Sequence, residues 1–281
     1  MMSPRDVLVL IKGAGDLASG VAARLQRCGF PVVMTELAEP LMVRRTVAFG
    51  EAVYAAEAIV EGIVARRADG LPDVRAALEC GAIPVLVDPL ASCRSELKPF
   101  VLVDAIMAKR NTGTTGADAP LVIGLGPGFT AGIDCHAVIE TNRGHAMGRV
   151  LWQGQAEPNT AMPGEVAGRC AERVLRAPGT GMLRSYVAIG DQVTSGQIVA
   201  SVDGQVVPAG LDGVLRGMLH TGLWVVAGTK LGDVDPRAEP MHCFTFSDKS
   251  LAIGGGVLEA ILTWLAARTP QHPTANTPRE P

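Results

Sequence analysis

Two glycines and an acidic residue near the N-terminus have the types and spacing that bind a dinucleotide. The stretch Val7–Lys12 is typical of a buried strand. It runs into Gly13, Ala14, Gly15, Asp16, Leu17 and Ala18, which match the pattern G-x-G-x-x-[GA]. A second apolar run ends in Glu36, 23 residues after Gly13. In this pattern the glycines allow a tight turn and close approach to a pyrophosphate, and the acid binds a ribose hydroxyl.

The helix expected from Leu17 to Cys28 would begin on this loop. Its unpaired N–H groups and its dipole favour an anion. Asp16 acts in the opposite direction, because a carboxylate repels phosphate unless it caps the helix or meets a ribose or a metal. The alternative interpretation is a strand–helix turn that binds nothing.

Polar residues after other expected strands complete the candidate binding set. Arg44 and Arg45 follow Pro40, which suits the first turn of a helix, and they either bind phosphate or carboxylate or lie on a solvated helix face. The other candidates are Lys109, Arg110 and Asn111, then Gly124, Gly126 and Gly128 in a second glycine-rich loop, and finally Asn142 and Arg143. The second loop is expected to form a nest for an anion, although glycine–proline turns also arise for geometric reasons alone.

Cysteine and histidine residues give weaker signals. Cys135, His136 and His145 lack further ligands at a recognisable spacing, so we expect no metal site. The six cysteines contain no C-x-x-C pair, which argues against a disulfide framework or a zinc ribbon. A transfer enzyme would need a thiolate of lowered pKa. Cys135 and then Cys93, before Arg94, are the candidates, and both are also typical of inert core or loop residues.

Strand-like and helical runs alternate through the first half of the chain. Strands are expected within 31–36, 59–65, 83–88, 100–107 and 120–126, and a helix within 71–81. This alternation predicts an α/β fold, a Rossmann-like doubly wound parallel sheet whose ligand crevice lies at the carboxyl ends of the strands.

The second half contains an internal repeat. Residues 183–203 and 215–235 align without a gap at an offset of 32 and are identical at seven of 21 positions. The first copy resembles the repeated element of biotinyl/lipoyl-type domains, which have a barrel-sandwich fold. The linking stretch 204–213 has no lysine, so we expect a wall of the crevice or a docking surface rather than a covalent carrier. Lys230, Asp233, Asp235 and Arg237 are consistent with a turn and a solvated edge.

These patterns divide the chain into four parts. We predict a Rossmann-like cofactor-binding domain over 1–155, a β module over 156–240, a closing strand and helix over 241–268, and a disordered, proline-rich tail over 269–281. Gly254, Gly255 and Gly256 weaken a helix unless another element approaches closely. The closing helix is therefore expected to start after them.

Composition and charge argue against some classes of function. The chain has 281 residues, 48% of them hydrophobic, and a formal charge of −3. This balance gives no global field for nucleic acid or an anionic membrane. No apolar run has the length of a signal-peptide core or a membrane helix, so we expect a cytoplasmic protein.

Several motifs together resemble one family. Taken together, they look like the accessory proteins of selenium-dependent molybdenum hydroxylases, which are distantly similar to xanthine dehydrogenase accessory factors. The motifs are GAGDLASG, MTELAEPLMVRRTVAF, DAIMAKRNTGT, DAPLVIGLGPGFTAG, HAVIETNRGH, GDVDPR and SDKSLAIGGGVLEAIL. The resemblance implies a role in maturing a molybdenum hydroxylase. It carries over no catalytic residue.

Three functions remain open. The leading hypothesis is a maturation factor that binds molybdopterin cytosine dinucleotide, whose pyrophosphate resembles that of NAD. Its partners would be the apo-hydroxylase and enzymes of cofactor biosynthesis, and a homo-oligomer is also open. The alternatives are an NAD(P)-dependent oxidoreductase, although Tyr54 and Tyr186 form no Tyr-x-x-x-Lys pair, and a selenium- or sulfur-transfer enzyme. Whether the protein catalyses any reaction is left open.

Overall fold

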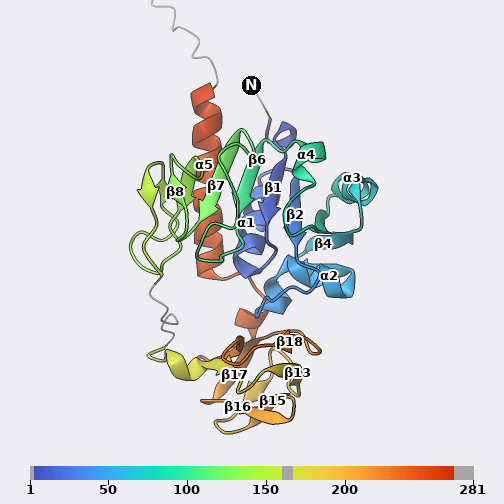
Figure 1. The fold of residues 1–281 in the computed structure, drawn as a ribbon, viewed down its shortest axis with the longest axis vertical. Helices are drawn as coiled ribbons and strands as arrows, with labels where there is room; N and C mark the ends of the chain where they lie inside the picture. The colour runs from blue at the N-terminus through green and yellow to red at the C-terminus, as the bar shows by residue number, and fades with distance from the viewer. Residues whose placement is uncertain (1–2, 160–166, 269–281) are drawn as a thin grey trace, which may run out of the picture.

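The computed structural model describes residues 3–159 and 167–268. The chain forms an α/β unit and, below it in Figure 1, a smaller unit built only of strands. We call the second unit, Val174–Asp235, the β module. The expected tail at 269–281 lies outside the described residues.

A nine-stranded sheet forms the centre of the α/β unit. In spatial order its strands are β10 (Val150–Leu151), β9 (Ala137–Ile139), β7 (Leu121–Leu125), β6 (Val101–Asp104), β1 (Val9–Lys12), β2 (Val32–Glu36), β5 (Ile83–Val87), β4 (Ile63–Ala68) and β3 (Glu57–Val60). All neighbours from β9 to β4 pair in parallel, and the two edge strands pair antiparallel. The chain goes from β1 to β2 on one side and returns to β6 on the other, so β1 and β6 flank the topological switch point.

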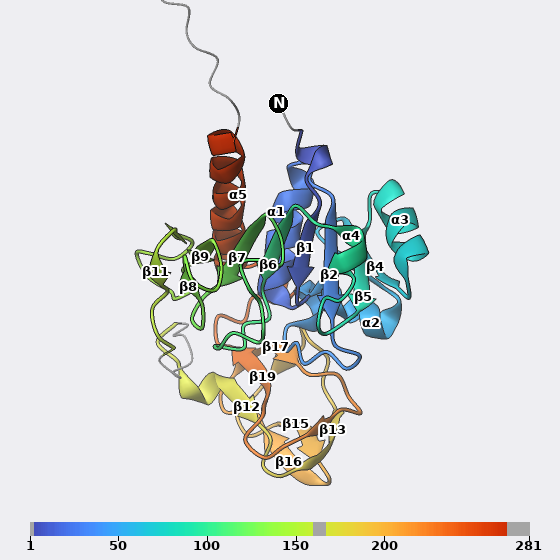
Figure 2. The same cartoon turned by 45° about the horizontal axis from the view of Figure 1, so that its top comes forward.

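Helices cover both faces of this sheet (Figure 2). α1 (Asp16–Arg27) and α5 (Asp248–Arg268) share one hydrophobic core with one face, and α3 (Leu71–Glu79) packs against the other. Shorter elements are α2 (Ala52–Ala55), α4 (Arg94–Leu97), a two-stranded sheet of β8 (Thr130–Ala131) and β11 (Gly154–Gln155), and 3-10 helices η1 (Pro4–Asp6), η2 (Arg45–Val47), η3 (Phe49–Glu51), η4 (Ala171–Arg173) and η5 (Pro240–Cys243). The expected α/β fold with a large, mainly parallel sheet is confirmed.

The β module contains two four-stranded antiparallel sheets. One has the order β12 (Val174–Arg176), β19 (Lys230–Asp235), β17 (Gly213–Met218), β14 (Gln192–Val193), and the other has β16 (Gln205–Pro208), β15 (Ile198–Val202), β13 (Gly181–Ser185), β18 (Trp224–Val225). Strands β13 to β15 lie 32 residues before β17 to β19, which is the offset of the repeat. Each sheet takes two strands from β12–β15 and two from β16–β19. The halves therefore exchange strands around one core that includes the repeat-related pair Leu183 and Leu215.

The three C-terminal glycines lie inside α5, so the expected helix start after them is wrong. A Cβ at Gly254 would lie 2.9 Å from the carbonyl oxygen of Gly20 in α1. A Cβ at Gly256 would meet the carbonyl oxygen of Gly148. Gly255 has open space. Two of the glycines are therefore explained by close approach, and Ser247 caps the helix by accepting a bond from the Ser250 N–H at 3.1 Å.

Three other local predictions also differ from the structure. The stretch 59–65 is a hairpin rather than one strand, because Glu61 and Gly62 both adopt positive φ between β3 and β4. No helix follows Pro40 directly, and the next element is η2. The closing strand expected from 241 is instead the 3-10 helix η5.

Among the described residues, α5 is the one helix long and apolar enough to cross a membrane by length and composition. A core helix of a soluble protein passes the same test. α5 buries Ile253, Val257, Ala260 and Ile261 in the core that it shares with α1 and the sheet. Packing of these four residues therefore accounts for part of its apolar composition.

Candidate functional site

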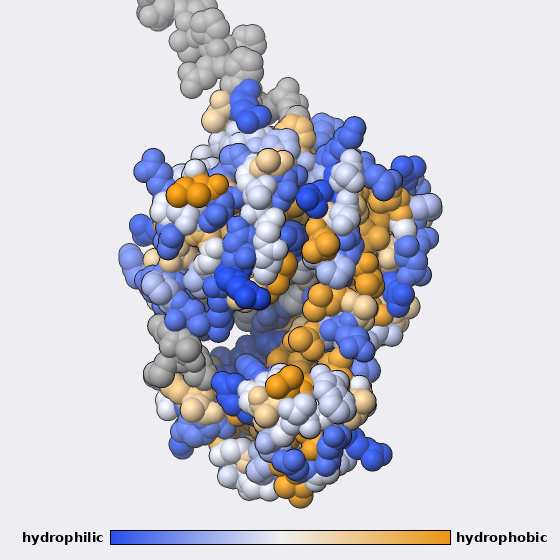
Figure 3. Space-filling model, viewed as in Figure 1, coloured by the Kyte–Doolittle hydropathy of each residue, from blue (hydrophilic) through white to orange (hydrophobic). Residues whose placement is uncertain are grey.

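A cleft of about 540 Å³ lies at the carboxyl ends of β1, β2 and β6. It is lined by Gly13, Gly15–Ala18, Thr35–Leu37, Leu41–Arg44, Pro89 and Ala105–Met107, and by Lys230 and Asp233 of the β module. Figure 3 shows that the surface is hollowed between the two units, with hydrophilic side chains on one side of the hollow and hydrophobic side chains on the other. The size is in the ordinary range for a small-molecule site, and the position is the one where α/β sheets bind ligands.

Positions 13 and 15 of the loop are glycine for different physical reasons. Gly13 adopts φ +92°, and a Cβ there would lie 3.1 Å from the Ala105 carbonyl oxygen, so the fold itself requires glycine. Gly15 has φ −70°, which any residue adopts, and a Cβ there would meet no atom within 4 Å. The protein's own packing therefore does not explain Gly15. A side chain at this position would instead take up space in the cleft.

α1 begins directly on this loop. Gly15 is its N-cap and no side chain caps it, so the first-turn N–H groups have no intrahelical partner. Asp16 lies in the first turn and pairs with Arg44, whose Nη1 is 3.3 Å from Asp16 Oδ2. Arg44 also donates to the carbonyl oxygen of His242 at 3.0 Å. Because Asp16 is paired with a cation, its carboxylate opposes an anion at the helix N-terminus less than the sequence suggested.

Glu36 lies beside the same loop, at the end of β2. Its carboxylate accepts the N–H of Ala14 at 3.3 Å and the N–H of Leu37 at 2.6 Å. Burial raises the pKa of Glu36, and the two backbone hydrogen bonds lower it in part. A carboxylate held here can also accept from a ribose hydroxyl, and it would repel a 2′-phosphate.

The segment Leu41–Thr46 joins the cleft to the β module. The Met218 N–H donates to the Val43 carbonyl oxygen at 2.8 Å, and Arg45 Nε donates to the Met218 carbonyl oxygen at 2.9 Å. The ring of Tyr54 stacks on His220, with centroids 4.1 Å apart. Arg45 is thus a contact between the two units and does not line the cleft, whereas Arg44 does.

The second group of candidate residues lies apart from the cleft lining. Lys109 and Arg110 are exposed. Asn111 organises its own loop, because its side chain accepts the N–H groups of Gly113 and Thr114 and donates to the Thr114 carbonyl oxygen. None of the three lines the cleft.

Packing accounts for the glycines of the second loop. A Cβ at Gly124 would meet the ring of Phe129, one at Gly126 would meet the Thr141 hydroxyl, and one at Gly128 would meet the Arg110 backbone. The loop touches the cleft region through Met107, whose Cε lies 3.4 Å from a Cβ built at Gly126. The nest expected here stays a prediction, since close packing already explains these glycines.

Asn142 and Arg143 belong to the connection after β9. Asn142 donates to Glu157. Arg143 forms a bidentate ion pair with Asp248 at the start of α5. The distances are 2.7 Å from Nη1 to Oδ2 and 2.9 Å from Nη2 to Oδ1. The neighbouring Lys249 is half-buried, and burial lowers its pKa. These residues fasten α5 and do not line the cleft.

A buried polar cluster beneath the cleft was not identified from the sequence. Lys12 Nζ donates to the Thr114 hydroxyl at 2.6 Å and lies 3.4 Å from Asp104, and the same hydroxyl donates to Asp104 at 2.6 Å. Lys12 and Asp104 end the neighbouring strands β1 and β6. The signal available in the sequence was a lysine at the end of one apolar strand and an aspartate at the end of another. The cluster ties the loop after β6 to the sheet.

The two candidate thiols, Cys93 and Cys135, do not favour transfer chemistry. Burial, followed by the hydrogen bond and charge of Asp88, raises the pKa of Cys93 to about 12. Burial raises the pKa of Cys135 to about 11. His136 Nδ1 accepts the N–H of Val122, and burial lowers the pKa of this histidine. No group of three or more His, Cys, Asp or Glu side chains that could hold a metal ion occurs in the part of the chain that the structure describes.

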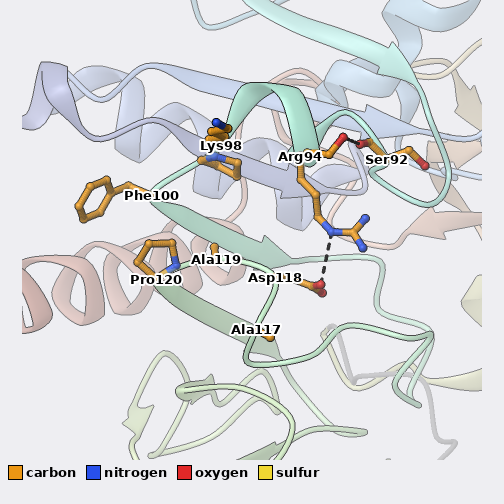
Figure 4. A pocket seen from close by; sticks show the side chains of 10 residues that line it. Ser92, Arg94, Lys98, Phe100, Ala117, Asp118, Ala119 and Pro120 are labelled. Atoms are coloured by element: carbon orange, nitrogen blue, oxygen red, sulfur yellow. Dashed lines mark hydrogen bonds and ion pairs between the residues drawn. The ribbon is translucent and has the colours of Figure 1, made fainter.

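A larger open groove of about 1020 Å³ lies elsewhere (Figure 4). Arg94 of α4 reaches across it to Asp118, with Nε 3.3 Å from Oδ1. Phe100 and Pro120 line it and directly precede β6 and β7. The groove is thus at the amino ends of these strands, at the opposite edge of the sheet from the glycine loop.

A charged cluster holds the end of β19. Asp235 is fully buried, accepts two bonds from the Arg237 side chain, and lies 3.6 Å from Arg216. Burial acts to raise the pKa of Asp235, but the hydrogen bonds and charge of Arg237 and the charge of Arg216 lower it to about 2.

This cluster predicts a loss of stability in acid. The folded-state pKa of Asp235 is below the unfolded value of 3.8, so its contribution of about 2 kcal/mol is present above pH 4 and is lost as the pH falls toward 2. Urea unfolding of Asp235→Asn should show lower stability than wild type at neutral pH and a smaller loss between pH 4 and 2. The repeat-related Asp203 is exposed, and Asp203→Asn is the matched control. Equal acid sensitivity in wild type and Asp235→Asn would contradict this assignment.

The fold and cleft define a class: a Rossmann-like α/β protein whose glycine-loop crevice is walled by a β module. No protein-family model matches the chain. The uncharacterized protein YqeB of Escherichia coli (strain K12) is 52% identical over 255 residues, which are 91% of this chain and 47% of YqeB. YqeB is a homologue over the matched region, and the chain spans about half the length of this curated relative.

Similarity to solved structures is weak. The ectoine utilization protein EutE (DoeB) of Ruegeria pomeroyi is 11% identical, with 81% of this chain and 85% of that chain covered and a TM-score of 0.26. A succinylglutamate desuccinylase/aspartoacylase of Rhodobacter sphaeroides is 18% identical, with 81% and 84% covered and a TM-score of 0.26. These TM-scores do not establish a shared fold.

Proposed function

We propose that this protein binds a dinucleotide-type cofactor at Gly13–Ala18 and acts as an accessory factor in maturing a molybdenum hydroxylase. The observation that carries the binding step is Gly15, whose open space and extended backbone have no explanation in the protein's own packing. The uncapped N-terminus of α1 and the pairing of Asp16 with Arg44 support an anion at the same place.

The rest of the cleft offers contacts to the ribose and to the base of such a ligand. Glu36 can accept from a ribose diol. Leu37, Leu41 and Ile106 line the cleft and are more than one-third exposed, so the flat face of a base would cover apolar surface there. Molybdopterin cytosine dinucleotide is the first candidate, because the sequence motifs resemble those of molybdenum-hydroxylase accessory proteins. The partners would be the apo-hydroxylase and enzymes that make the cofactor.

NAD is the second candidate ligand, and the position of Glu36 favours NAD over NADP. Hydride transfer commonly uses an acid–base side chain near the substrate. Among the described residues that line the cleft there is no histidine, tyrosine or cysteine. Asp16, Glu36 and Lys230 of the lining are the acid–base side chains that such a reaction would have to use.

Native mass spectrometry of the protein titrated separately with molybdopterin cytosine dinucleotide, NAD(H) and NADP(H) tests the proposal. We expect preferential binding of the molybdenum cofactor. Preferential binding of NAD(H) together with oxidation of NADH would replace the maturation role by a redox enzyme. Absence of binding by all three would remove the cofactor role altogether.

A further inference from the structure

One wall of the cleft comes from the α/β unit and the other from the β module. Of the five charged side chains in the lining, four have polar partners among the described residues and one does not. Asp16 and Arg44 neutralise each other at 3.3 Å. Asp233 of β19 pairs with Arg173 at 2.8 Å, and both side chains are buried. Glu36 accepts two backbone N–H groups. The fifth charged residue of the lining, Lys230, has no ion-pair or hydrogen-bond partner among the residues that the structure describes.

A pyrophosphate carries more negative charge than one helix N-terminus compensates, since the dipole supplies only about half an elementary charge. The cation on the α/β side, Arg44, is already engaged by Asp16 and by the His242 carbonyl oxygen. Lys230 is therefore the available counter-charge in the cleft. It is exposed and stands at the start of β19, on the wall that faces the glycine loop.

The internal repeat gives an independent reason to regard Lys230 as a binding residue. At an offset of 32, Lys230 corresponds to Ile198 and Asp233 to Ser201. β15 and β19 occupy equivalent places in the two exchanged sheets, and both sheets form. The strand arrangement of the module thus does not need a lysine at position 230, whereas Asp233 is used by its buried ion pair with Arg173. The charged versions occur in the copy that lines the cleft.

We infer that the β module forms the second wall of the binding site, and that Lys230 contacts the phosphates of a ligand bound on Gly13–Ala18. This inference rests on the proposed function and adds to it a ligand held by both units. Contacts between Val43, Arg45 and Met218 hold β17, the neighbour of β19, against the segment that lines the cleft.

Calorimetric titration of the full chain with molybdopterin cytosine dinucleotide and with NAD tests the inference. Lys230→Ala should weaken binding of whichever probe the wild type binds by about tenfold at low salt, and less at high salt, because a charge-assisted contact is lost. Lys230→Glu should weaken it further. Arg184→Ala removes the same charge from an exposed site in the other half of the module and is the matched control, expected to bind as wild type.

The outcomes separate the inference from the proposed function. Wild-type affinity in both Lys230 variants, with binding lost in Gly15→Asp, would overturn the contact between Lys230 and the ligand. The binding site at the glycine loop would be unaffected by that result. Failure of the wild type to bind either probe overturns both. Equal weakening in Arg184→Ala would show a general charge effect and would also overturn the role of Lys230. Thermal unfolding confirms that each variant is folded.

Discussion

Gly15→Asp is expected to weaken dinucleotide binding by about 100-fold or more while the protein stays folded. The substitution is compatible with the backbone, since Gly15 has φ −70° and a Cβ there would meet no atom within 4 Å. Aspartate is also a good N-cap and would bond to the first-turn N–H groups of α1. It would thereby occupy the donors and the space that a phosphate needs. Loss of two charge-assisted hydrogen bonds corresponds to about this factor in affinity.

The matched control is Gly70→Asp. Gly70 is the uncapped N-cap of α3, has an extended backbone, and is not part of the cleft lining. The same change there should leave affinity unaltered. Binding is measured by calorimetry, and a ligand that raises the melting temperature of wild type should no longer raise that of Gly15→Asp. Unchanged affinity in Gly15→Asp would show that the loop binds no phosphate.

Gly254→Ala is expected to destabilise the protein by about 3 kcal/mol, although alanine favours a helix more than glycine does. The new Cβ would lie 2.9 Å from the Gly20 carbonyl oxygen and 3.2 Å from Val21 Cα, so α5 would have to move away from α1. Overpacking of this kind commonly costs about 1 to 3 kcal/mol. The upper end is expected here, because the nearest backbone belongs to a helix packed in the core.

The adjacent Gly255 has open space and serves as the control in the same turn of α5. Gly255→Ala should stabilise the protein by about 1 kcal/mol through helix propensity alone. Urea unfolding of the two variants measures the contrast directly. Stabilisation by both substitutions would mean that α5 and α1 do not approach as closely as the structure has them.

The sequence by itself determined the features that depend on residues near one another in the chain. The glycine pattern predicted a tight turn between a strand and a helix at Gly13, and the alternation of strands and helices predicted a doubly wound sheet with a crevice at the carboxyl ends of its strands. The offset of 32 residues marked the two copies of one β structure. The sequence also placed Glu36 at the end of a strand next to the loop. Such signals are local, because turn geometry and strand burial act over a few residues.

The tertiary structure decided which distant side chains meet. Asp16 is paired with Arg44, 28 residues away. Lys230 and Asp233, which alone were consistent with a solvated edge, line the cleft. The three glycines of α5, which were expected to precede the helix, lie within it, two of them against neighbouring backbone. The physical reason is shared by all three cases: a residue type shows what contacts a side chain can make. The partner is set by how whole helices and sheets pack.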